Sequence, residues 1–287
     1  ASGSIIKNVK SVIVPHTNGL KGIEVAAAAG ALYGDANAKL EVLSSATKQQ
    51  IEELPEYVRK TNITVQHIEQ GHVFDLEVNV YYEQEHASVR IVDAHTNIVQ
   101  MEKNWEVIYE DKTTNLEHKA DHSALIMKQI WDFSHTVDIE DIKEILEQQI
   151  TCNMAIANEG IHNSYGANIG HVILNMDSDC VKTKAKAYAA AGSDARMNGC
   201  ELPVVINSGS GNQGITCCVP VVVYAKELNC TEEQLYRALV LSNLTAIYIK
   251  TGIGTLSAFC GAVSAGAAAG AGIAFLHDGT YEEIQHT

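Results

Sequence analysis

A run of small and polar residues between positions 207 and 214 is the segment of this sequence best suited to bind a ligand. It follows the apolar run 202–206, and its glycines allow several backbone N–H groups to converge on an anion with no side chain in the way. We name this segment the cradle and predict that it binds substrate through Asn207, Ser208, Gly209, Ser210, Gly211, Asn212, Gln213 and Gly214.

Two other interpretations of the cradle stay open. Gly209, Gly211 and Gly214 have the spacing of a dinucleotide-binding fingerprint, which would make the chain a nucleotide-binding enzyme. That fold requires a second parallel strand with an acidic residue at its end, whereas the pattern after Gly214 predicts helices. Three glycines within six residues are also typical of a tight structural turn.

Arg196 precedes the cradle and is the candidate anion-binding side chain. It lies with Asp194 in a region that carries little charge, and a buried charge needs a partner. Its guanidinium can bind a substrate carboxylate through two parallel hydrogen bonds. Alternatively, Asp194 and Arg196 simply brace each other.

Seven cysteines, an odd number, occur in a chain whose first residues show no charged and then apolar signal segment. We therefore expect reduced thiols and a cytoplasmic location rather than a disulfide scaffold. Most of these cysteines are expected to be small buried hydrophobes, because none has zinc-finger spacing. Cys260 precedes a glycine-rich helix, where a thiolate can face a metal cluster, although its local sequence alone favours a structural role.

The balance of charge excludes two classes of partner. Lys and Arg number 20 against 35 Asp and Glu, a net charge of −15 that repels nucleic-acid phosphates and an anionic membrane surface. Residues 251–276 carry no charge and are long enough to span a bilayer. Their alanines and glycines instead favour closely packed helices inside a protein, so we expect no membrane span.

An α+β fold would position these residues. Alternating polar and apolar residues predict a small antiparallel sheet with strands at 61–65, 73–81, 86–92 and 105–109, whose histidines, such as His86, are expected to be solvated. Helical spacing occurs at 22–32, 41–59, 121–131, 138–158, 182–191 and 231–248. We predict a mainly helical, Ala- and Gly-rich catalytic domain, formed by a first segment at 1–45 and a body at 116–287, with an inserted α+β domain at 46–115.

Several motifs follow one another along the whole chain. They are Ile6-Lys7-Asn8, Gly19-Leu20-Lys21-Gly22, Leu40-Glu41-Val42-Leu43, Tyr165-Gly166-Ala167-Asn168-Ile169-Gly170, Asp194-Ala195-Arg196-Met197, Asn207 to Ile215, Ala246-Ile247-Tyr248-Ile249-Lys250 and Phe259-Cys260-Gly261-Ala262-Val263. In this order they resemble the serine dehydratase alpha-chain-like family, which includes L-cysteine desulfidase.

The resemblance implies an iron–sulfur-dependent lyase. Such an enzyme converts L-cysteine or L-serine into pyruvate and ammonia, with release of sulfide or water, and holds a 4Fe-4S cluster by three cysteines. Arg196 and Lys250 would then be catalytic candidates, the cradle would bind the small amino-acid substrate, and Cys260 would be a cluster ligand. The family's other two cysteine ligands match no residue here, so we expect a parent chain that is longer at both ends and a fragment that is inactive alone.

Two alternatives to the lyase are kept. One is a non-catalytic binding or regulatory member of the same fold, and the other is the nucleotide-binding enzyme that would use the Gly209–Gly214 loop. Residues 151–287 hold only 7 basic and 11 acidic side chains, against 13 and 24 in residues 1–150. This apolar second half is compatible with a homo-oligomer.

Overall fold

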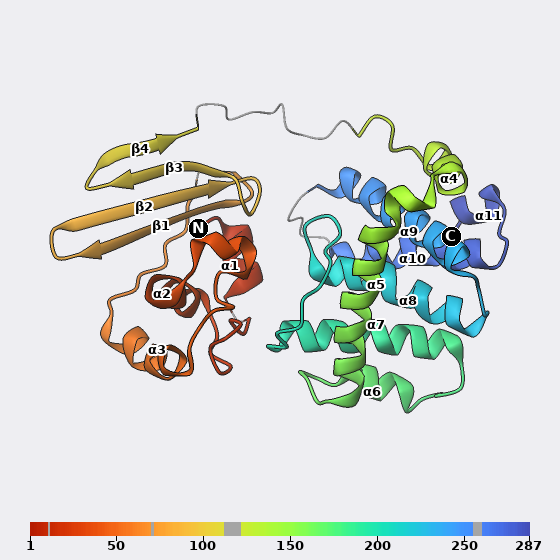
Figure 1. Cartoon of the computed structure of the whole chain (residues 1–287), viewed down its shortest axis with the longest axis horizontal. Coiled ribbons are helices and arrows are strands. Elements are labelled where there is room, and N and C mark those ends of the chain that lie inside the picture. The colour runs from red at the N-terminus through yellow and green to blue at the C-terminus, as the bar shows by residue number, and fades with distance from the viewer. Residues whose placement is uncertain (11, 70–71, 112–121, 255–259) are drawn as a thin grey trace. The chain divides into compact units, whose positions relative to one another are not determined.

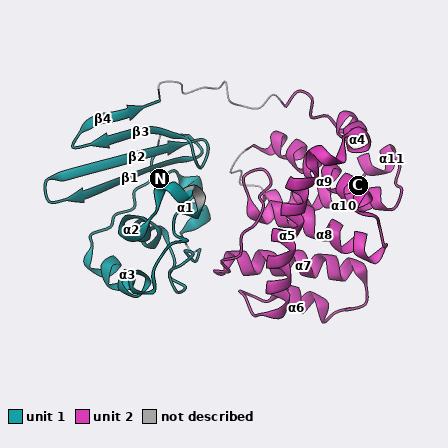
Figure 2. Ribbon diagram, in the orientation of Figure 1, with its two compact units in different colours: residues 1–119 teal, residues 120–287 magenta. Residues whose placement is uncertain are grey.

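The computed structural model describes residues 1–10, 12–69, 72–111, 122–254 and 260–287. The chain divides into two compact units, Ala1–Lys119 and Ala120–Thr287 (Figure 2). The first unit contains helices and one antiparallel sheet, whereas every regular element described in the second unit is a helix (Figure 1). The predicted α+β class, mainly helical with a small antiparallel sheet, is confirmed.

Unit 1 begins with short helices that build a core of their own. They are α1 (Gly3–Val9), α2 (Ile23–Tyr33), the 3-10 helix η1 (Ala36–Glu41) and α3 (Lys48–Lys60). Thr47 and Gln50 form a capping box that starts α3. The buried residues of this core, all from the helices and the loops between them, are Val14, Val25, Ala28, Ala29, Tyr33 and Leu54.

The sheet follows these helices along the chain. It consists of β1 (Asp75–Tyr82), β2 (Glu85–Val92), β3 (Ile98–Lys103) and β4 (Glu106–Glu110), antiparallel and in sequence order (Figure 1). The prediction of a strand at 61–65 is wrong, because these residues have no regular structure. The prediction also missed β3, which has an extra residue, Val99, opposite Arg90 and Ile91 of β2, so that a bulge interrupts its alternation of apolar residues.

The first 45 residues belong to the same compact unit as the sheet, so the chain divides differently from the three expected segments. Ser2 ties α1 to the strand region, because its hydroxyl donates to the Val73 carbonyl (2.8 Å) and its N–H donates to the Asp75 carbonyl (2.7 Å). These bonds join positions that are 71 and more residues apart in sequence. A contribution of residues 1–45 to a catalytic domain stays a prediction.

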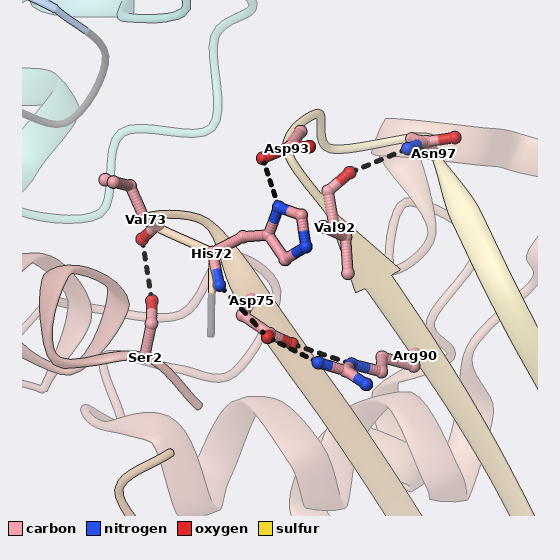
Figure 3. A network of polar contacts seen from close by, with 8 residues as sticks. All are labelled: Ser2, His72, Val73, Asp75, Arg90, Val92, Asp93 and Asn97. Atoms are coloured by element: carbon pink, nitrogen blue, oxygen red, sulfur yellow. Dashed lines mark hydrogen bonds and ion pairs between the residues drawn. The ribbon is translucent and has the colours of Figure 1, made fainter. Parts of the chain in front are cut away.

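A buried ion pair fixes β1 against β2 (Figure 3). Asp75 is fully buried and accepts from Arg90 Nε (3.0 Å) and Arg90 Nη2 (2.7 Å). The His72 N–H also points at this carboxylate, at 3.4 Å. Burial alone would raise the pKa of Asp75, but the hydrogen bond and charge of Arg90 outweigh it, and the pKa is lowered.

The turn between β3 and β4 consists of Asn104 and Trp105, both with positive φ, as the tight hairpin turn that matches strand twist requires. Trp105 stacks on the His86 ring with centroids 4.0 Å apart, and Tyr81 lies on the ring at 4.9 Å. His86 is therefore only 3% exposed, and the prediction that it is solvated is wrong.

Unit 2 packs its long helices around one apolar core. Its elements are α4 (Met127–Thr136), α5 (Ile139–His162), α6 (Ile169–Leu174), α7 (Val181–Met197), α8 (Gly211–Glu227), α9 (Glu232–Ile253), α10 (Gly261–Leu276) and α11 (Tyr281–Gln285). Asp138 caps α5 and Thr231 caps α9, as their sequences predict. The fully buried side chains Ile156, Ile215 and Leu239 come from α5, α8 and α9 and meet in the core.

The charge-free run 251–276 does not form one helix. α9 ends at Ile253 and α10 begins at Gly261. Among the described residues, no helix combines the length and the apolar composition needed to cross a bilayer.

Candidate functional site

The cradle is half turn and half helix, rather than a continuous loop. Asn207 and Ser210 exchange backbone hydrogen bonds of 3.1 and 3.0 Å, and the turn between them has Ser208 at φ 49° and Gly209 at φ 78°. α8 begins at Gly211, and the Ser210 hydroxyl accepts from the Gln213 N–H (3.5 Å) as the N-cap. The last four cradle residues therefore form the N-terminal turn of a 17-residue helix, whose dipole favours an anion.

Gly211 and Gly214 of the cradle lie so close to neighbouring atoms that a side chain does not fit at either position. A Cβ at Gly214 would overlap the Val205 carbonyl, and a Cβ at Gly211 would overlap the Arg196 guanidinium. Gly209 differs from both, because no heavy atom lies within 4 Å of its Cβ position. The extended run 202–206 and Arg196 thus lie directly against the first turn of α8.

A cluster of three amides, two of them buried and one half-buried, holds the cradle in place. Asn243 of α9 accepts from Gln149 Nε2 (2.9 Å) and Asn207 Nδ2 (3.0 Å) at one oxygen, and its own Nδ2 donates to Gln149 Oε1 (2.8 Å). The Asn207 oxygen in turn accepts from the Ser208 hydroxyl (2.8 Å). The turn is thereby tied to α5 and α9, the helices that carry Gln149 and Asn243.

Asn153 holds the extended run 202–206, which leads into the cradle. Its side chain accepts from the Val205 N–H (2.9 Å) and donates to the Val205 carbonyl (3.1 Å), and it is fully buried. Sequence reasoning missed Gln149, Asn153 and Asn243. Their signal is an amide on an otherwise apolar helix face, where a buried polar group needs a specific partner.

Arg196 lies at the cradle without a carboxylate partner among the described residues. Its Nη1 donates to the Asn212 side-chain oxygen (3.2 Å) and contacts the Met197 sulfur (3.5 Å), and neither group is charged. Burial lowers the pKa of Arg196. Asp194, the alternative brace, accepts the Ile169 N–H at 2.8 Å, and within the described residues it forms no ion pair with Arg196. A guanidinium in this position is suited to an anionic ligand.

Gln213 links the cradle to the N-terminus of α10. Its side chain lies against Gly261, where a Cβ would overlap the amide, and it is only 5% exposed. Gln213 Oε1 is buried without a hydrogen-bond partner among the described residues. Cys260 is the N-cap residue of α10 and is exposed, directly before the glycine that Gln213 contacts. The structure thus brings Arg196, the cradle and Gly261, the first residue of α10, together.

Lys250 lies in the last turn of α9 and is 9% exposed. Within the described part of the chain, no hydrogen bond or ion pair connects its side chain to the cradle. Its catalytic role stays a prediction.

The thiols of this chain alone do not fit an iron–sulfur cluster. Two cysteines are buried, four are half-buried and Cys260 is exposed, so the expectation of mostly buried cysteines is only partly correct. Burial raises the pKa of Cys217 to about 12, and its protonated sulfur contacts the Gly214 carbonyl at 3.4 Å. In the described ranges, no three His, Cys, Asp or Glu side chains converge as metal ligands.

In a dinucleotide-binding fold, one parallel strand precedes the glycine-rich turn, and a second parallel strand follows the helix that the turn begins. Between residues 122 and 287, all described regular elements are helices, apart from the isolated bridge between Asn207 and Ser210. The cradle therefore lacks the sheet that this interpretation requires.

Comparison with known proteins finds relatives that match the whole length of the chain. Residues 37–287 match the family described as serine dehydratase alpha chain. The chain is 50% identical to a UPF0597 protein of Desulfitobacterium hafniense over 100% of its own length and 67% of the relative's. It is 47% identical to a UPF0597 protein of Lachnoclostridium phytofermentans, with 100% and 69% covered. No solved structure matches the chain.

The chain therefore belongs to the serine dehydratase alpha chain family. Membership of this family supports a lyase-like role in amino-acid catabolism. The chain spans about two thirds of the length of the curated relatives that it matches.

Proposed function

We propose that the protein is a lyase that eliminates the β substituent of L-cysteine or L-serine. The products are pyruvate and ammonia, together with sulfide from cysteine or water from serine. Family membership supports the reaction class. The substrate class is supported by one observation in particular: Arg196 is a half-buried guanidinium that has no carboxylate partner among the described residues and lies against the first turn of α8.

Arg196 and the cradle supply what an α-amino acid needs at its carboxylate. The guanidinium forms charge-assisted hydrogen bonds, and the N-terminal turn of α8 adds a partial positive charge. A carboxylate held by both has a fixed Cα, so its α-proton and its β substituent are presented to the rest of the site in one orientation. Gly261, the residue directly after Cys260, contacts the Gln213 side chain of the cradle.

The elimination itself balances without an oxidant. A base removes the α-proton, the Cβ–S or Cβ–O bond breaks, and the aminoacrylate that forms tautomerises to an imine, which water hydrolyses to pyruvate and ammonia. We propose Lys250 as a candidate for moving the proton, because it is a buried amine on the helix that carries Asn243.

We propose further that the whole enzyme holds a 4Fe-4S cluster to which this chain contributes Cys260. The described side chains of this chain do not form a complete ligand set for the cluster. This proposal therefore requires two more cysteines from outside these 287 residues. The exposed position of Cys260 at a helix N-terminus is suited to a thiolate ligand.

The test is an assay of the full-length protein, reconstituted anaerobically with iron and sulfide. We expect pyruvate from L-cysteine or L-serine, and we expect the Cys260→Ser variant to bind less iron and to lose the activity. The Cys230→Ser variant, at a half-buried cysteine preceding α9, is the matched control. A filled cluster without pyruvate contradicts the lyase, and amino-acid binding retained in that protein supports the non-catalytic alternative.

A further inference from the structure

An open pocket of about 480 Å³ lies in unit 2, where α4, the start of α9 and the turn between α10 and α11 come together (Figure 1). This volume is in the range of small-molecule sites. The pocket and the cradle lie at opposite ends of α10, because Gly261 at its first position contacts Gln213, whereas Phe275 near its end lines the pocket. A helix of 16 residues is about 24 Å long, so the pocket is not part of the cradle.

Aromatic rings form part of the lining of this pocket. The Trp131 and His135 rings, one helical turn apart on α4, have centroids 4.2 Å apart, and Phe275 lies 5.0 Å from His135 and 6.0 Å from Trp131. His135 Nδ1 lies 2.8 Å from the Trp131 carbonyl, which can only accept, so this nitrogen carries a hydrogen. The face of an indole is the aromatic surface that attracts a cation most strongly. The rings therefore give the pocket a surface suited to a cation.

A neighbouring ring of the same aromatic cluster already holds a cation. Tyr281 lies 6.1 Å from Trp131, and the Lys128 ammonium lies over the Tyr281 ring, 5.3 Å from its centroid. The charge of Lys128 is matched by Asp132 at 2.8 Å. Lys128 and Asp132 thus neutralise each other beside the pocket without belonging to its lining.

The charged side chains of the lining leave one carboxylate unmatched. Arg237 directs both Nε and Nη2 at Glu233 Oε1, each at 2.9 Å. Its Nη1 donates to the carbonyls of Ser134 (3.0 Å) and Val137 (3.4 Å). Asp278, in the turn after α10, forms no ion pair and no side-chain hydrogen bond with any described residue. With histidine neutral, the lining therefore has two acids and one base, an excess of one negative charge.

An anion is disfavoured here, although α9 begins at the pocket and an open helix N-terminus attracts one. Thr231 and Gln234 form a capping box that takes up each other's backbone N–H groups. Glu233 adds a negative charge in the first turn of the same helix. The net charge of −15 on the whole chain also repels an anion.

We propose that this pocket binds an organic cation, an ammonium group carried on an apolar body. The ring faces and the Asp278 carboxylate bind the ammonium, because both attract positive charge. Phe275 and Leu276 supply the apolar surface for the rest of the ligand. This inference is independent of the proposed reaction.

Calorimetric titration of the full-length protein with choline and with 3,3-dimethylbutan-1-ol tests the proposal. The two probes have nearly the same shape and differ in the positive charge. We expect choline to bind in the millimolar range that is usual for a ligand of few atoms, and at least about 10-fold more tightly than the neutral alcohol. Equal affinities, tighter binding of acetate than of choline, or no binding of choline would overturn the proposal.

Two matched variants locate the binding. Asp278→Asn removes the carboxylate at a position with φ 58°, which asparagine also adopts, so the turn is retained. We expect it to weaken choline binding about 3- to 5-fold. Asp132→Asn makes the same change of charge on α4, outside the lining, and should leave the affinity unchanged. Equal effects of the two variants, or no effect of Asp278→Asn, would contradict the proposed site.

Discussion

Arg196 is held beside the cradle by packing and by a neutral amide, so its charge stays available to a ligand. This arrangement distinguishes it from Arg90, whose charge is matched by Asp75. A cation that is half-buried without a matching acid costs folding free energy, and a bound anion offsets that cost. In the proposed function, Arg196 would therefore couple substrate binding to local stability.

We expect Arg196→Gln to raise the KM for the amino acid about 10- to 100-fold, because a hydrogen bond to a charged group contributes about 1.5–3 kcal/mol. Steady-state kinetics of the reconstituted full-length enzyme would measure this change. Arg59→Gln, at a side chain that is 76% exposed on α3, is the control and should leave KM unchanged. Equal KM values in the two variants would rule out a carboxylate-binding role for Arg196.

Gly214 and Gly209 offer a matched pair of single-methyl substitutions. Gly209→Ala adds a methyl group in open space at φ 78° and should cost about 1 kcal/mol of unfolding free energy. Gly214→Ala pushes a methyl group into the Val205 carbonyl and should cost about 3 kcal/mol, with loss of activity. Denaturant unfolding measures both values. A milder effect at Gly214 than at Gly209 would contradict the close approach described for α8.

Single residues of the site were partly predictable from the sequence. The small residues of the cradle and the isolated charge of Arg196 are local signals, and the structure places them in contact. The amides at 149, 153 and 243 were not found, because their partners are up to 94 residues away in sequence. A buried hydrogen bond over such a separation depends on how helices pack, which residue types alone do not specify.

At the scale of elements, helix starts were predicted best where a cap is encoded locally. Thr231 and Gln234 form the expected capping box of α9, and Asp138 caps α5. The N-terminus of α8 was not predicted, because Gly211 and Gly214 resemble a loop until their packing against Arg196 and Val205 is known. β3 was missed because its bulge interrupts the alternation of polar and apolar residues by which a strand is predicted.

The Asp75–Arg90 ion pair makes the stability of unit 1 depend on pH. The pKa of Asp75 is lowered in the folded state, so the unfolded state binds the proton first as the pH falls. The stabilisation is complete above the unfolded pKa of about 3.9 and is lost as the pH falls through the folded pKa. Unit 1 should therefore lose stability below a pH of about 4 more steeply than a variant without this carboxylate.

We expect Asp75→Asn to lower the unfolding free energy of unit 1 by about 2 kcal/mol at pH 7 and to flatten its dependence on pH between about 5 and 2. Urea unfolding at a series of pH values, followed by circular dichroism, measures both effects. Asp93→Asn is the control, because its carboxylate pairs with His72 at a solvated position. Parallel pH profiles of wild type and Asp75→Asn would contradict the coupling.

At the scale of the whole molecule, the two units have separate hydrophobic cores. The core of unit 1 is small, whereas that of unit 2 joins α5, α7, α8, α9 and α10. Composition predicted the apolar character of the second half but not the association of residues 1–45 with the sheet. That association depends on hydrogen bonds such as those of Ser2 with the segment at 73–75, which no local pattern encodes.

We expect the two units to unfold separately, with unit 1 unfolding at a urea concentration lower by about 1 M or more, because it buries less apolar surface. Hydrogen–deuterium exchange in increasing urea should show β1 and β2 exchanging before α8. Peptides from α5 serve as an internal control and should follow α8. One common midpoint for all these peptides would contradict independent units.

The distribution of the two tryptophans has a practical consequence. Trp105 is 70% exposed in the hairpin turn of unit 1, and Trp131 lies in unit 2 with its ring centroid 6.0 Å from that of Phe275. Replacing either indole by phenylalanine leaves one tryptophan, whose selectively excited fluorescence then reports on a single unit. The chain thus carries its own pair of optical labels, one for each unit.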